Sequence, residues 1–108
     1  MNIPYEKLEQ QIATVCIRAY AAHSYLYYER DESLITDQEF DALCVFLLGN
    51  YKWIKQWDLD KYLSRDALKA GTGFDIASKV CGQTKDYAES ILAEHNKASP
   101  PENDLLGF

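Results

Sequence analysis

The sequence predicts an all-α fold, a small helical bundle built on a long antiparallel helical hairpin. Three observations favour this fold. Apolar residues recur every three or four positions in two long segments, a helix-capping sequence lies between these segments, and no stretch alternates apolar and polar residues as a strand does. A length of 108 residues and a hydrophobic content of 47% fit one compact domain with a real core.

The first predicted helix runs from about Pro4 to about Glu29. Pro4 suits the first helical turn, because the N–H that proline lacks would have no partner there. One apolar stripe follows the helix, with spacings of four and three residues: Leu8, Ile12, Val15, Ala19, Ala22 and Leu26. A helix this long needs another element to cover its stripe, and we expect the second helix to do so.

The second predicted helix begins at a capping box formed by Thr36 and Glu39. Its apolar stripe continues through Phe40, Leu43 and Leu47, and Gly49-Asn50 weakens or ends it. The pattern loosens after this point, where we expect a short helix around the leucines at 59, 63 and 68 and a turn at 70–73. A last helix is expected from about Phe74 to about Asn96.

Composition and charge restrict the function. The chain has 11 basic and 17 acidic residues and a formal charge of −6, which argues against direct nucleic-acid binding because no basic patch is present. The three cysteines form no CxxC pair, so neither a metal site nor a disulfide framework is expected. The longest uncharged apolar stretch, 42–49, is too short to span a bilayer, and we expect a soluble, cytoplasmic protein.

Aromatic and acidic side chains gather around the first interhelical turn. Asp37, Phe40 and Asp41 are spaced i, i+3 and i+4, so they share one face of the second helix, and two like charges four residues apart favour a bound cation. Tyr27 and Tyr28 lie off the apolar stripe, so at least one ring is expected to face outward. Aromatic faces beside two carboxylates suit a flat cationic ring. A purely structural explanation stays open, since acids also favour helix N-termini.

A known family has the same pattern. The run His23-Ser24-Tyr25-Leu26-Tyr27-Tyr28, followed by Asp31, Ile35, Asp37, Glu39, Phe40-Asp41 and Leu43, resembles the N-terminal Ia domain of bacterial NAD-dependent DNA ligases. The family pattern is Tyr-x-Tyr-Tyr or Tyr-x-Tyr-His, then Asp-x-Pro-x-Ile-Ser-Asp-x-Glu-Tyr-Asp-x-Leu. The match runs without a gap from His23 to Leu43, about a fifth of the chain.

The resemblance implies a helical hairpin that binds the nicotinamide mononucleotide (NMN) half of NAD. The implied nucleotide-binding positions are Tyr27, Tyr28, Asp37, Phe40 and Asp41. Two positions depart from the family. Phe40 replaces a tyrosine and so lacks a hydroxyl that could bind ribose or phosphate, and Ser33 replaces the loop proline.

The adenylation core of the ligases is missing, because the chain contains no Lys-x-Asp-Gly nucleophile motif. The resemblance therefore implies a stand-alone, non-catalytic module with weak affinity for NAD or NMN, and its size and family distribution favour an accessory protein of bacteriophage DNA metabolism. One alternative is an acidic interaction module that inhibits or recruits a bacterial replication or repair protein, with nucleotide binding lost. A lower-ranked option is a domain that assists a ligase in trans.

We expect residues 1–96 to form the domain and residues 97–108 a flexible acidic tail. The tail resembles the partner-binding tails of single-stranded DNA-binding proteins, with Asp104, Leu105, Leu106 and Phe108 as candidate contacts, although a solubilising end explains it equally simply. Gly71-Thr72-Gly73 could offer amides to a phosphate, but an ordinary turn is the simpler interpretation.

Overall fold

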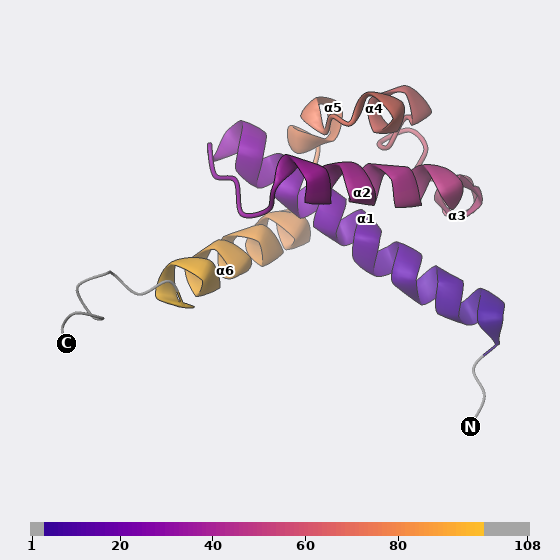
Figure 1. Ribbon diagram of the computed structural model, residues 1–108, viewed down its shortest axis with the longest axis horizontal. Helices are drawn as coiled ribbons and strands as arrows, with labels where there is room; N and C mark the ends of the chain where they lie inside the picture. Colours follow the sequence, from indigo (N-terminus) through magenta and orange to yellow (C-terminus); the bar gives the residue numbers. More distant parts are fainter. Residues whose placement is uncertain (1–3, 99–108) are drawn as a thin grey trace.

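The computed structural model describes residues 4–98, and within this range it contains helices and no strands. The helices are α1 (Tyr5–Glu29), α2 (Asp37–Gly49), α3 (Tyr51–Gln56), α4 (Arg65–Ala70), α5 (Phe74–Ala77) and α6 (Gly82–Ala98). The predicted all-α helical bundle is confirmed. Figure 1 shows α1 at the centre, with α2 to α5 on one side of it and α6 on the other.

The two sides of α1 form two apolar clusters. On the side of α2 to α5, Tyr20 packs with residues such as Cys44, Leu47 and Ile54. On the side of α6, Ala22 and Leu26 pack against this cluster's α6 members, Ala88 and Leu92. Because a single helix serves both clusters, α1 needs apolar residues on more than one face.

The predicted stripe on α1 is only partly correct. Ala22 and Leu26 are fully buried beneath α6, but Leu8, Ile12 and Val15 are 40%, 44% and 65% exposed. Three residues in this part of α1 belong to or pack against the main cluster, and they lie on another side of the helix: Cys16, Ile17 and Tyr20. The reason is that α6 reaches only the C-terminal half of α1, so the N-terminal half of the stripe has no cover among residues 4–98 (Figure 1).

The capping box of α2 forms as predicted. The backbone N–H of Glu39 donates to the Thr36 hydroxyl at 3.0 Å, and the backbone N–H of Thr36 donates to the Glu39 carboxylate at 2.8 Å. Figure 1 shows α2 crossing α1 obliquely after the connecting segment 30–36. The chain reverses through this segment with Asp31 in the left-handed region, at φ 56°.

The chain between α2 and α6 differs in detail from the prediction. The expected single helix from Phe74 to Asn96 is wrong, because the chain leaves the helical conformation at 78–81 and divides it into α5 and α6. The break lets Ile76 of α5 join the main cluster while Ala88 and Leu92 of α6 join the second one. Among the described residues, no helix is long and apolar enough to cross a membrane.

Candidate functional site

A pocket of about 310 Å³ lies where the end of α1, the segment 30–36, the start of α2 and the turn after α4 meet. All five residues predicted from the sequence line it: Tyr27, Tyr28, Asp37, Phe40 and Asp41. They are joined by His23 and Ser24 of α1, by residues 33–36 and by Gly71. The structure therefore brings the predicted constellation together around one cavity, although the sequence places it on two different helices.

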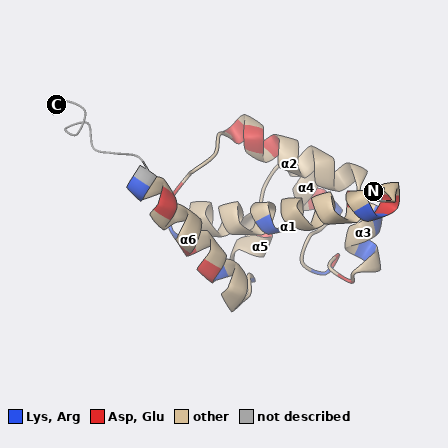
Figure 2. Ribbon diagram, turned by 90° about the horizontal axis from the view of Figure 1, so that it is seen from below, with Lys and Arg blue, Asp and Glu red and all other residues tan. Residues whose placement is uncertain are grey.

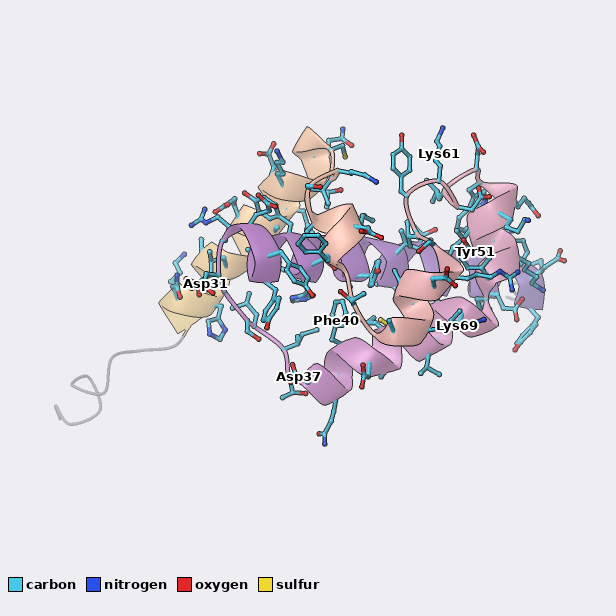
Figure 3. All side chains as sticks on the ribbon, turned by 90° about the horizontal axis from the view of Figure 1, so that it is seen from above. Asp31, Asp37, Phe40, Tyr51, Lys61 and Lys69 are labelled. Carbon is cyan, nitrogen blue, oxygen red and sulfur yellow. The ribbon has the colours of Figure 1, made fainter. Side chains whose placement is uncertain are left out.

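Local sequence explains this placement. The capping box fixes where α2 begins, and from that start Asp37, Phe40 and Asp41 fall on the face that lines the pocket. Tyr27 and Tyr28 lie in the last turn of α1, at the opposite wall. Figure 3 shows Asp37 at the start of α2 and Phe40 between α2 and α1.

The aromatic rings of the pocket have different surroundings. Tyr27 and Tyr28 are 53% and 39% exposed, and their rings meet edge to face with centroids 4.8 Å apart. Phe40 is half-buried and stacks on Tyr20 at 5.4 Å, with 26° between the ring planes. One face of Phe40 thus belongs to the core, whereas the two tyrosine rings remain accessible to a ligand.

The charge of the pocket is negative. Asp37 and Asp41 are exposed, and neither forms an ion pair with any residue in 4–98. In the part of the chain that the structure describes, no lysine or arginine lines the pocket. Figure 2 shows the acidic residues in red on the first turns of α2, and Figure 3 shows Lys61 and Lys69 set apart from Asp37. The two carboxylates therefore offer uncompensated negative charge to a cationic ligand.

His23 adds an unused polar group to the pocket wall. Its Nδ1 is shielded from solvent and has no hydrogen-bond partner in the described part of the chain. Burial lowers the pKa of His23, and the smaller effect of the Glu39 charge opposes this. The imidazole is therefore neutral at pH 7, with one nitrogen able to donate and the other able to accept.

The turn 71–73 lies against the site, and this position was not predicted from the sequence. The hydroxyl of buried Tyr20 donates to the Thr72 carbonyl at 2.7 Å, and the hydroxyls of Tyr28 and Thr72 lie 3.0 Å apart. A Cβ on Gly73 would lie 1.8 Å from the Ser24 hydroxyl oxygen and 3.2 Å from Cζ of Phe40. The signal that could have found this contact was the pair of glycines, which permits close backbone approach.

Two further sequence-based expectations concern a partner-binding tail and a metal site. Asp104, Leu105, Leu106 and Phe108 of the predicted tail lie outside the described residues. Among residues 4–98, no group of three His, Cys, Asp or Glu side chains could hold a metal ion.

Comparison with known proteins gave no relatives: no family model matches the chain, and no match was found among curated proteins or solved structures.

Proposed function

We propose that the protein is a non-catalytic module that binds the nicotinamide ring of NMN or NAD, as its resemblance to a ligase Ia domain implies. The observation that carries the proposal is the pocket itself. Two exposed tyrosine rings and two carboxylates without a cationic partner in residues 4–98 line the same cavity. Few ligands need this combination, and a flat ring with a positive charge is one of them.

The chemistry of the nicotinamide ring fits each wall of the pocket. In NAD and NMN the ring is a pyridinium, which stacks on aromatic faces and is attracted to carboxylates. Tyr27 and Tyr28 supply the aromatic faces on α1, and Asp37 and Asp41 supply the charge on α2. Each such contact contributes ~0.5 to 2 kcal/mol, so after the cost of immobilising the ligand we expect a dissociation constant near ~1 mM.

The proposed role is binding without covalent chemistry. A ligase forms its adenylyl intermediate on a lysine, and this chain has no Lys-x-Asp-Gly sequence. None of the residues that line the pocket is a lysine. Among residues 4–98, the pocket lining therefore supports recognition of the nicotinamide ring and offers no lysine nucleophile.

Titration of ¹⁵N-labelled protein with NMN and NAD tests the proposal. We expect amide shifts confined to the pocket, and we expect Tyr27→Ala and Asp37→Asn to weaken them severalfold. Tyr62→Ala is a matched control, since Tyr62 is an exposed tyrosine that does not line the pocket. The absence of pocket shifts at about 5 mM, well above the expected dissociation constant, would rule the proposal out.

A second candidate function is contact with another protein, such as a DNA replication or repair protein. The observation that favours it is the exposed apolar side of α1, formed by Tyr5, Leu8, Ile12 and Val15. A pull-down from bacterial lysate with Ile12→Glu/Val15→Glu, compared with Asp37→Asn/Asp41→Asn, separates this surface from the acidic pocket. If both variants capture the same proteins as the wild type, neither surface is the contact.

A further inference from the structure

We infer that the pocket selects nicotinamide compounds that carry no phosphate, such as nicotinamide riboside or N-methylnicotinamide (methylated on the ring nitrogen), over NMN and NAD. This inference rests on the proposed function and names its ligand class more closely. It follows from the charges around the pocket: among residues 4–98 the lining provides two carboxylates for the cationic ring but no positively charged side chain for a phosphate group.

The described lining of the pocket has no positively charged side chain to pair with a phosphate. A phosphate site in a protein normally contains arginine, lysine or free backbone N–H groups. Among residues 4–98, no arginine or lysine lines this pocket. Arg30, which directly follows α1, is engaged elsewhere, because its guanidinium pairs with Glu89 of α6. A phosphate bound near the ring would therefore face Asp37 and Asp41 without a counter-charge.

The turn 71–73, which the sequence offered as a candidate phosphate site, has few free N–H groups. Three backbone N–H groups in and beside it already donate within the chain: that of Gly71 to Leu68, that of Thr72 to Ala67 and that of Phe74 to the Thr72 hydroxyl. A carboxylate also lies against the turn, since a Cβ on Gly71 would be 2.6 Å from Oδ1 of Asp41. Within the turn only the N–H of Gly73 has no partner among residues 4–98, and the Asp41 carboxylate flanks the turn with negative charge.

The N-terminus of α2 faces the same pocket. Helix N-termini attract phosphate through unpaired N–H groups and the macrodipole. Here the capping box uses the N–H groups of both Thr36 and Glu39. Asp37, in the first turn, adds its own negative charge at the positive end of the dipole. The capping box therefore uses two of the four N–H groups of this terminus, and the carboxylates of Asp37 and Glu39 place negative charge where a phosphate would bind.

Four ligands test the inference by NMR titration: N-methylnicotinamide and nicotinamide riboside, which are cations; nicotinamide, which is neutral; and NMN, which carries a phosphate. We expect nicotinamide riboside to bind about five- to tenfold more tightly than NMN at low salt, since the phosphate lies within reach of two carboxylates. We also expect N-methylnicotinamide to bind severalfold more tightly than nicotinamide.

Removing the two carboxylate charges of the pocket tests whether they cause the preference for nicotinamide riboside. In Asp37→Asn/Asp41→Asn the preference for nicotinamide riboside over NMN should fall to about twofold or less, and about 0.5 M salt should act in the same direction. Asp58→Asn/Asp60→Asn is the matched control, because these exposed acids lie outside the pocket, and it should keep the preference.

The outcomes separate the two proposals. If NMN binds in the pocket as tightly as nicotinamide riboside, the inference is wrong and the proposed function stands. If nicotinamide binds as tightly as N-methylnicotinamide, the role of the carboxylates is wrong and the inference falls with it. If none of the four ligands shifts the pocket residues, both the inference and the proposed function fail.

Discussion

A Cβ atom on Gly71 would lie 2.6 Å from Oδ1 of Asp41, so the turn that follows α4 touches the carboxylate side of the pocket. Gly71 is also in the left-handed region, at φ 70°. The left-handed backbone conformation favours glycine at this position, and a side chain there would also push the Asp41 carboxylate aside. The contact connects residues thirty positions apart in the sequence, and it makes the pocket depend on the fold of the whole domain.

Substitution of Gly71 should damage both stability and binding. We expect Gly71→Ala to lower the free energy of unfolding by about 1–2 kcal/mol, because the left-handed conformation is strained for alanine and the new methyl group displaces Asp41. Urea denaturation measures the loss. Gly49→Ala is the control, since a Cβ there meets nothing within 4 Å. Equal stability of the two variants would contradict the proposed constraint.

Two buried tyrosines each donate a hydrogen bond to a backbone carbonyl, but only one of these carbonyls lies in the turn 71–73. Comparing the two therefore separates the effect of the turn on ligand binding from a general loss of stability. Tyr20 donates to the Thr72 carbonyl, and Tyr51 donates to the Leu63 carbonyl at 2.5 Å. Burial raises the pKa of both hydroxyls, so both remain protonated donors. Tyr20→Phe and Tyr51→Phe should each cost about 1–2 kcal/mol of stability, since each leaves a carbonyl without its partner.

Only one of these variants should affect ligand binding. Tyr20→Phe releases the turn that lies against the pocket, so we expect weaker binding of nicotinamide compounds in an NMR titration. Leu63 does not line the pocket, so Tyr51→Phe should bind as the wild type does. A parallel loss of binding in both variants would show that the turn has no specific role.

The pH dependence of stability should contain a contribution from His23. Its pKa in the folded protein is lowered by burial, so below about pH 6.5 the unfolded chain binds more protons than the folded one. The stability that is present above this pH is therefore lost as the pH falls. We expect His23→Gln to flatten the decrease in unfolding free energy between pH 7 and pH 5.

Chemical denaturation between pH 7 and pH 5 tests whether the unfolding free energy falls with pH as predicted. The exposed His95 provides the matched variant, and His95→Gln should retain the slope of the wild type. A slope in His23→Gln as steep as that of the wild type would mean that other groups cause the acid sensitivity.

Substitutions on the exposed side of α1 should change stability much less than substitutions at its buried C-terminal end. Val15 is 65% exposed and Leu26 is fully buried under α6. We expect Val15→Ala to change stability by less than about 0.5 kcal/mol and Leu26→Ala to cost about 2–5 kcal/mol. Thermal and urea unfolding measure both values. A large loss in Val15→Ala would show that the predicted stripe is covered along its whole length.

Local sequence predicted the elements that local interactions determine. The capping box formed where Thr36 and Glu39 predicted it, and α1 has the expected bounds to within a residue, because both depend on contacts within a few positions. The five predicted pocket residues also came together, since three share one face of α2 and two lie in the last turn of α1.

The features that were missed depend on contacts between distant segments. The periodicity of α1 could not show that α6 covers only part of the stripe, because the position of α6 depends on packing between segments far apart in the sequence, such as Leu26 with Leu92. The break at 78–81 likewise arises because Ile76 and Ala88 pack into different clusters. Gly71 and Gly73 read as an ordinary turn, and only their packing against Asp41 and Ser24 reveals their place at the pocket.

The most direct measurement of the central claim is an intermolecular NOE experiment with N-methylnicotinamide at millimolar concentration. We predict NOEs from the ring protons of the ligand to the ring protons of Tyr27 and Tyr28, and we predict that these NOEs become severalfold weaker in Asp37→Asn/Asp41→Asn. NOEs to residues outside the pocket, or NOEs that persist unchanged in that variant, would contradict a pocket that holds a flat cation between aromatic rings and carboxylates.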